Sequence, residues 1–228
     1  ANGLLNGSAM FVLDALNATH FLLADEQGQI FVVDAQSSNV ETVCLITVDK
    51  TRTYAEVICK NADAELLELS IENKEPIQKA INAGRIMLAA DSVGASQTMI
   101  DKAVDYAKER KQFGRVIGSF QAVKHLLANV HTQIEFTRPT IWLAAAKGGA
   151  NVHAAKIAAI DTATQAAEAA IQVFGGMGYT FEVDLHLFMK RAWALSNEWG
   201  DRNFHARALS EHVFASDREI GPGVSFAS

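Results

Sequence analysis

The sequence of 228 residues contains little cysteine, no long apolar run and no excess of positive charge. Its two cysteines, Cys44 and Cys59, have neither CxxC nor histidine-rich spacing. Their spacing therefore argues against a disulfide framework and against a cysteine zinc site. We expect both to be strand or core thiols, because free cysteine is often buried.

The chain has no apolar stretch approaching the roughly 20 residues that span a bilayer, and no basic segment followed by an apolar one at its start. We expect a cytoplasmic protein without a membrane span. The formal net charge of −6 argues against a general nucleic-acid binder. The seven histidines lack the spacing of metal ligands, so we expect surface or satisfied core histidines and no metal site.

Residues 1–72 are expected to form part of an antiparallel β domain. Residues 25–28 (DEQG) have the chemistry of a hairpin turn, Asn6-Gly7 is a turn pair, and the acidic run 62–69 fits a short helical turn or a strand. The domain begins abruptly, so we expect upstream sequence to be missing. The predicted strands are runs rich in β-branched and apolar residues: 9–13, 18–23, 29–33, 43–48 and 54–59.

Residues 73–228 are expected to form an antiparallel, four-helix-bundle-like domain, which makes the protein mainly α. Apolar residues recur there at three-to-four spacing. Ser119 is the expected N-cap of the second helix, and Pro139 is expected to kink or interrupt it. The predicted helices run from Glu75 to the turn within 106–121, then over 120–147, 151–174, 184–195 and 202–214.

Residues 106–121 read YAKERKQFGRVIGSFQ and predict a helix end, a tight cationic turn and a new helix. Cations such as Arg110 complement the negative end of a helix dipole. The planar fork of arginine also suits pyrophosphate oxygens. Phe113 and Gly114 would place an aromatic ring beside a bare backbone turn, and Gln121 could hydrogen-bond a ribose or a ring.

Residues 172–179 read QVFGGMGY and again place glycines after a helix. These glycines are either helix caps or bare backbone that lets a cofactor approach closely. They do not follow a strand and open a helix, so they are not a Rossmann fingerprint. Together the two stretches predict a site for an anionic, aromatic cofactor.

The pattern RKQFGRxIxxFQ, followed about fifty residues later by QxFGGxGY, resembles the C-terminal half of the acyl-CoA dehydrogenase family. The resemblance runs from about Arg85 to about Gly200, and the early strands resemble the late part of that family's central β domain. The family's N-terminal helical domain has no counterpart here.

This resemblance implies FAD at a subunit interface, with one subunit holding its adenosine and pyrophosphate. It also implies that Arg85 contacts an acyl-CoA substrate, that electron-transfer flavoprotein or a similar acceptor is a partner, and that the protein is a homo- or hetero-oligomer, a dimer or tetramer. The implied FAD contacts are Arg110, Gln112, Phe113, Phe120, Gln121, Gln172, Phe174, Gly175 and Gly176.

The reaction that the resemblance implies is α,β-dehydrogenation of an acyl-CoA thioester, in which a glutamate removes the α-proton and the flavin takes the β-hydride. Trp199 and Gly84 stand at the two positions where family members carry that base. Glu198 is one residue earlier, which turns a helical side chain by about 100°. The catalytic residue is therefore unknown, with Glu198 as a weak candidate.

Three hypotheses remain open at this point. The chain is an FAD-dependent acyl-CoA dehydrogenase, or a non-catalytic subunit of the same fold that gives half of a flavin site to an active partner. The third is a helical interaction module without a cofactor, in which the glycine turns are only caps. An absorbance spectrum and an acyl-CoA turnover assay separate the three.

Overall fold

The computed structural model describes residues 2–68 and 75–215. It divides into two compact units, Ala1–Ala80 and Ile81–Ser228, and each is described by itself. The domain boundary predicted after residue 72 lies outside the described residues. The division of the structure falls within the first long helix.

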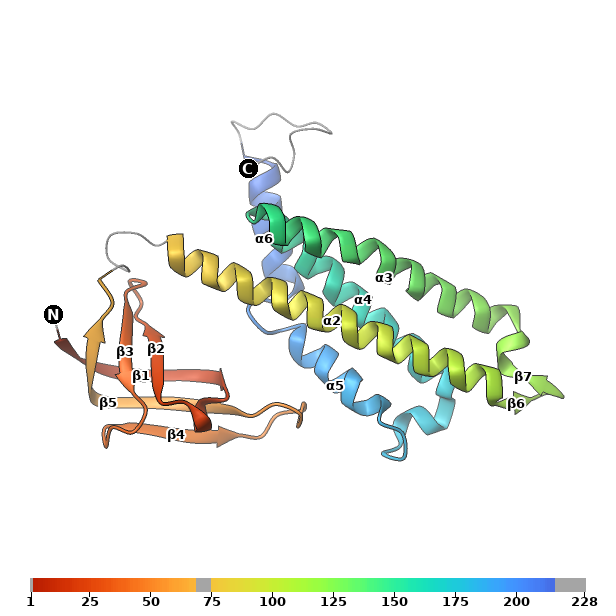
Figure 1. Ribbon diagram of the computed structural model, residues 1–228, viewed down its shortest axis with the longest axis horizontal. Coiled ribbons are helices and arrows are strands. Elements are labelled where there is room, and N and C mark those ends of the chain that lie inside the picture. Colours follow the sequence, from red (N-terminus) through yellow and green to blue (C-terminus); the bar gives the residue numbers. More distant parts are fainter. Residues whose placement is uncertain (1, 69–74, 216–228) are drawn as a thin grey trace. The chain divides into compact units, whose positions relative to one another are not determined.

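The first unit is an antiparallel sheet, as the sequence predicts (Figure 1). Its order is β1-β5-β3-β2, and β4 also pairs with β5. The predicted turn at 25–28 joins β2 to β3, and the Asp25 carboxylate accepts hydrogen bonds from the backbone N–H groups of Gln27 and Gln29 at 2.9 and 2.8 Å. The strands are β1 (Asn2–Leu13), β2 (His20–Ala24), β3 (Ile30–Asp34), β4 (Val40–Leu45) and β5 (Tyr54–Leu66), with a short 3-10 turn η1 (Ala15–Asn17).

The structure contradicts one local prediction for this sheet, and it decides between two alternatives for another. Asn6-Gly7 is not a turn: β1 continues through it with a register shift against β5 between Leu5 and Gly7. The Asn6 side chain accepts a hydrogen bond from the Asn61 backbone N–H at 2.8 Å, which satisfies the backbone where the ladder is interrupted. The acidic run after residue 61 is strand as far as Leu66.

The sheet buries a small core around Phe21, Val33 and Val57. Both cysteines lie in strands, as predicted. Cys59 on β5 is buried, and Cys44 on β4 is exposed; both are free thiols.

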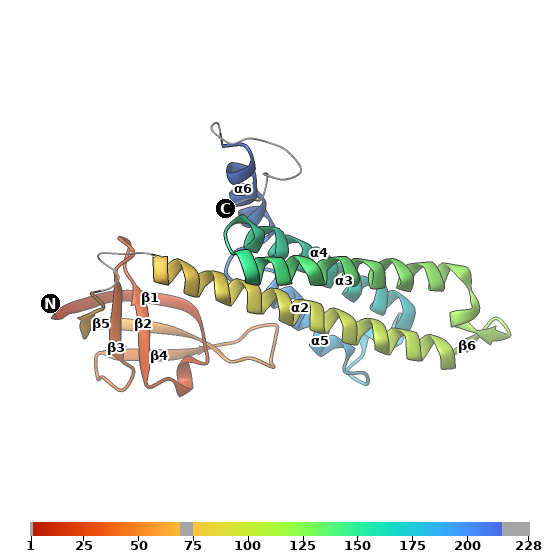
Figure 2. The ribbon, with the colours of Figure 1, turned by 45° about the horizontal axis from the view of Figure 1, so that its top comes forward.

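The second unit is helical, and the predicted fold class is confirmed. Helix α4 packs against α3, α5 and α6, and the two views show α2 running beside α3 (Figures 1 and 2). The helices are α2 (Glu75–Glu109), α3 (Gln121–Lys147), α4 (Ala150–Phe174), α5 (Leu185–Leu195) and α6 (Arg202–Val213). Shorter elements are the hairpin β6 (Lys111–Gln112) with β7 (Arg115–Val116), and the 3-10 turns η2 (Ile117–Ser119) and η3 (Gly175–Tyr179). Among the described residues, no helix is long and apolar enough to cross a membrane.

Helix α3 differs from its prediction at Ser119. Ser119 is not an N-cap: it closes η2, and its hydroxyl donates to the Val116 carbonyl at 2.7 Å. Helix α3 continues without interruption through Pro139. Thr137 and Ile141 are buried on either side of the proline, and the Thr137 hydroxyl lies 2.7 Å from that of Thr162 on α4, so packing holds this part of α3 in place. Gly148, with a φ of 66°, follows the last residue of α3, where the sequence predicts its end.

Alanines on α4 form the centre of the helical core. A bare methyl group lets neighbouring helix backbones approach closely, which sets the spacing of the bundle. Seven alanines on this helix have at most 2% of their surface exposed: Ala155, Ala159, Ala163, Ala166, Ala167, Ala169 and Ala170.

Replacing Ala166 by leucine should therefore overpack the bundle. Ala166 has none of its surface exposed, and extra methylene groups in a packed core cost about 1–3 kcal/mol. We expect the free energy of unfolding in urea to fall by that amount. The matched control is Gln165→Leu on the exposed side of the same helix, and an equal loss in both variants would contradict the close packing of α4.

Candidate functional site

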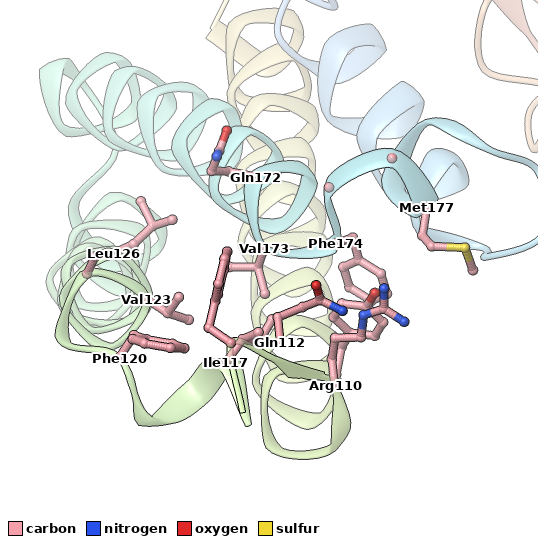
Figure 3. Close-up of a pocket in the computed structure, with 15 residues that line it drawn as sticks. Arg110, Gln112, Ile117, Phe120, Val123, Leu126, Gln172, Val173, Phe174 and Met177 are labelled. Carbon is pink, nitrogen blue, oxygen red and sulfur yellow. The ribbon is translucent and has the colours of Figure 1, made fainter. Parts of the chain in front are cut away.

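A cavity of about 730 Å³ lies where α2 ends, α3 begins and α4 ends. It brings together the two glycine-containing stretches of the sequence. Eight of the nine predicted cofactor contacts line it: Arg110, Gln112, Phe113, Phe120, Gln172, Phe174, Gly175 and Gly176. The ninth, Gln121, is the exposed first residue of α3 and is not part of the lining. In Figure 3, Arg110 lies on the side of Phe174 and Met177, and Phe120, Val123 and Leu126 lie on the other side.

The β6–β7 hairpin forms one wall of this cavity. The Ile117 backbone N–H donates to the Arg110 carbonyl at 2.8 Å and closes the hairpin. Phe113 and Gly114 at its tip have φ values of 54° and 79°. This tight turn directs the Phe113 ring towards solvent, and 90% of the surface of that residue is exposed. The sequence predicted the turn but not that it is a two-stranded hairpin.

Aromatic rings pack along two sides of the cavity. The rings of Tyr106 and Phe174 stack with centroids 4.3 Å apart and an interplanar angle of 15°. On the α3 side, Phe113 meets Phe120 edge to face, and the Arg115 guanidinium carbon lies 4.1 Å from the Phe120 ring centroid. Stacked and edge-on arrangements of this kind hold aromatic rings in fixed orientations.

The end of α4 supplies bare backbone. Gly175 has a φ of 61°, and a side-chain carbon built at Gly175 or Gly176 would meet no atom of the described residues within 4 Å. The space beside this turn is therefore open, and both glycines line the cavity. With the guanidinium of Arg110 and the carboxamides of Gln112 and Gln172, the cavity offers donors for an anion next to flat apolar surfaces.

A second hollow, of about 390 Å³, contains Arg85, the predicted substrate contact. The Arg85 Nε donates to the Trp199 carbonyl at 3.1 Å, and its guanidinium carbon lies 5.2 Å from the Phe204 ring centroid. Ile81 and Gly200 complete the lining. This hollow shares no lining residue with the Arg110 cavity, so the structure does not bring Arg85 together with the predicted cofactor contacts.

Glu198, the weak candidate for a catalytic base, is not part of the lining of the Arg85 hollow, whereas its neighbour Trp199 is. Its charge acts instead on the Lys156 ammonium, whose pKa it raises against the larger lowering caused by burial.

The sequence did not predict a buried polar cluster, which consists of His153, His205 and Lys156. The Nδ1 atoms of His153 and His205 lie 2.9 Å apart. His205 is completely buried and, within the described part of the chain, its Nε2 has no hydrogen-bond partner, which corrects the expectation of surface or satisfied histidines. Lys156 is also completely buried, and its ammonium donates to the Leu195 carbonyl. A lysine on the apolar face of an alanine-rich helix was the signal available in the sequence.

Burial and neighbouring cations lower the pKa values of the basic groups in this cluster. Burial, followed by the charges of His153, Arg85 and Lys156, lowers the pKa of His205 to about 4. Burial also lowers the pKa of Lys156 to about 8. Within the described residues, no group of three histidine, cysteine, aspartate or glutamate side chains is placed to hold a metal ion.

The fold and these two hollows define a helical-bundle domain that presents one cationic, aromatic cavity at the end of α2 and one arginine-containing hollow near its start. Residues 75–214 match the model of the acyl-CoA dehydrogenase C-terminal domain. The chain therefore belongs to the acyl-CoA dehydrogenase family.

Individual relatives agree with this assignment. The chain is 39% identical over 131 residues to acyl-CoA dehydrogenase IpdE2 of Mycobacterium tuberculosis, covering 56% of this chain and 41% of that one. It is 30% identical over 235 residues to an acyl-CoA dehydrogenase of Bacillus subtilis, covering 92% and 60%. It resembles the structure of butyryl-CoA dehydrogenase from Megasphaera elsdenii with a TM-score of 0.82 at 23% identity, over 91% of this chain and 59% of that one. The chain thus spans 41% to 60% of the lengths of these proteins.

The lowered pKa of His205 predicts that acid destabilises the helical unit. The unfolded chain takes up the proton near the usual pKa of 6.5 and the folded chain only near 4, so this contribution to stability is complete above pH 6.5 and is lost as the pH falls towards 4. We expect the free energy of unfolding to drop by about 2 kcal/mol between pH 7.5 and 5. Lys156 titrates above this range.

Urea unfolding of the His205→Asn variant should show a shallower dependence on pH between these two values. His131→Asn, on the exposed side of α3, is the matched control and should keep the wild-type dependence. Identical slopes in wild type and His205→Asn would show that His205 is not held neutral.

Proposed function

We propose that this chain provides one side of an FAD site in an acyl-CoA dehydrogenase, a flavoprotein that catalyses α,β-dehydrogenation of an acyl-CoA thioester. The observation that carries the proposal is that two stretches about fifty residues apart line one cavity. Their side chains are those that an adenosine and a pyrophosphate need. Membership of the acyl-CoA dehydrogenase family supports the same assignment.

The residues present fit the adenosine and pyrophosphate end of FAD. Arg110 would pair with pyrophosphate oxygens, since its guanidinium offers two parallel donors. The open backbone at Gly175 and Gly176 lets a phosphate or ribose come close, and Phe113 and Phe120 offer ring surfaces for stacking. When bound, the flavin accepts the hydride that leaves the acyl β-carbon.

A second subunit is part of the proposal. The cavity is open, and Phe113 at its rim is 90% exposed, so one chain covers only part of a bound dinucleotide. A homo- or hetero-oligomer, dimer or tetramer, would close the site from the other side. Electron-transfer flavoprotein or a similar acceptor would then reoxidise the cofactor.

Arg85 is the proposed contact to the acyl-CoA substrate. Its guanidinium is half-buried and is held by the Trp199 carbonyl and the Phe204 ring. A donor fixed in this way costs little entropy when it binds a carbonyl or carboxylate oxygen.

A specific observation favours a second candidate function, that of a non-catalytic subunit. Trp199 lines the Arg85 hollow and Glu198 does not, so no carboxylate lines that hollow in the described structure. A proton acceptor must lie within hydrogen-bond reach of the carbon acid that it deprotonates. In this candidate the chain holds the cofactor and a partner subunit supplies the base.

Replacing Arg110 by alanine should weaken FAD binding. Losing a charge-assisted pair costs about 1.5–3 kcal/mol, or roughly 10- to 100-fold in Kd. The quenching of flavin fluorescence on titration with the purified chain measures the constant. Lys108→Ala is the matched control, because Lys108 pairs with Asp105 at 3.2 Å and does not line the cavity. Equal Kd values for wild type and Arg110→Ala would contradict the assignment, and no FAD binding at all would favour the interaction module.

Turnover with a saturated acyl-CoA and an electron-acceptor dye separates the two candidates. If the chain alone is an enzyme, it reduces the dye; if it is a non-catalytic subunit, only its complex with a partner does. Because Glu198 does not line the Arg85 hollow, we expect Glu198→Gln to leave kcat of an active preparation within about threefold, an effect on the order of 0.7 kcal/mol. Proton abstraction is measured as deuterium exchange at the substrate α-carbon. Its loss in this variant would identify Glu198 as the base.

A further inference from the structure

Gly84 on α2 and Trp199 in the turn between α5 and α6 are in direct contact. A side-chain carbon built at Gly84 would lie 2.8 and 3.0 Å from Cζ3 and Cη2 of the indole. The 2.8 Å distance is shorter than real contacts of this kind and the 3.0 Å distance is shorter than most of them, so the indole occupies the space that a side chain at position 84 would need. The glycine in the middle of a long helix, which costs up to about 1 kcal/mol against alanine, is thereby explained.

The turn that carries this indole is fixed from both sides. At its start, the buried ammonium of Lys156 holds the Leu195 carbonyl. In its middle, Arg85 donates to the Trp199 carbonyl. At its end, the Asp201 carboxylate caps α6 by accepting from the Phe204 N–H at 2.7 Å, and Arg202 forms two hydrogen bonds to Asp161 on α4, at 2.7 and 3.1 Å.

The backbone of the turn leaves little freedom for the indole to move aside. Trp199 and Gly200 have φ values of 60° and 113°, and a side chain at Gly200 would lie 2.5 Å from the Phe204 ring. A bulky residue with positive φ is uncommon and persists only where the surroundings hold it. The backbone that carries the indole is therefore held in place, and the indole forms one wall of the Arg85 hollow.

We propose that Trp199 is the residue that determines specificity at the Arg85 hollow, because its indole excludes an acyl chain from the space along α2 beside Gly84. The space beside Gly84 is then closed to the aliphatic chain of a longer thioester whose carbonyl or carboxylate group lies at Arg85. This inference rests on the proposed role of Arg85 as the acyl-CoA contact.

Binding of butanoyl-CoA and octanoyl-CoA to the full chain, measured by calorimetry, tests the proposal. Both thioesters carry the same coenzyme A, so the ratio of their Kd values reports the acyl chain alone. We expect a ratio near one for wild type. In Trp199→Ala the vacated space buries added methylene groups, each worth about fourfold in affinity when fully buried, so octanoyl-CoA should bind at least 10-fold more tightly than butanoyl-CoA.

Trp142→Ala is the matched control, since Trp142 on α3 is 69% exposed and does not line the hollow; its ratio should stay at the wild-type value. Preferential binding of octanoyl-CoA by wild type, or the same ratio in Trp199→Ala as in wild type, would overturn the proposal. So would a failure of both thioesters to bind after the indole is removed. FAD binding is measured on the same samples as a control. If the substitution leaves the Kd for FAD unchanged, these outcomes do not come from a failure of the flavin site.

A second set of variants tests the contact without any ligand. Gly84→Ala should lower the thermal midpoint of wild type, because the added methyl group meets the indole. The same substitution in the Trp199→Ala background should leave the midpoint unchanged or raise it, since alanine favours the helix. Equal effects of Gly84→Ala in the two backgrounds would show that the indole does not occupy this space.

Discussion

The close packing of α4 is the constraint on which the rest of the helical unit depends. Its buried alanines allow α3 to lie against it, and this contact places the start of α3 beside the end of α4. The Arg110 cavity exists because those two helix ends and the end of α2 meet. Larger residues along α4 would push the ends apart and separate Phe120 from Gly175, although neither residue would be changed.

The same helix also carries a charged group whose burial costs folding free energy. Lys156 is completely buried, and a buried charge is tolerated only when it is paired or bound by dipoles. Its ammonium holds the Leu195 carbonyl at the end of α5, where the helix dipole favours a cation. Burial is the main cause of the lowered pKa values of His153 and His205, and the positive charge of Arg85 lowers both further.

Local features of the fold could be predicted from the sequence, and contacts between distant residues could not. The 3.6-residue periodicity, the glycines at 148 and 175 and the DEQG turn act within a few residues, so they gave the helices and a hairpin correctly. Ser119 and Asn6-Gly7 misled because Ser119 lies in a 3-10 turn and Asn61 lies across the sheet from Asn6. The contact of Gly84 with Trp199 and the burial of His205 depend on the packing of three helices, for which single-residue patterns carry no signal.

The two hollows are physically independent, so the proposed cofactor contacts and the proposed substrate contact lie apart on the helical unit. Both border α2, but Arg85 and Tyr106 are 21 residues apart on it, which at 1.5 Å per residue is roughly 31 Å. Distances of this size exceed the Debye length of about 8 Å at physiological salt, so charges at one hollow have little effect on the other. Because no lining residue is shared, substitutions at either hollow can alter one property of the chain without altering the other.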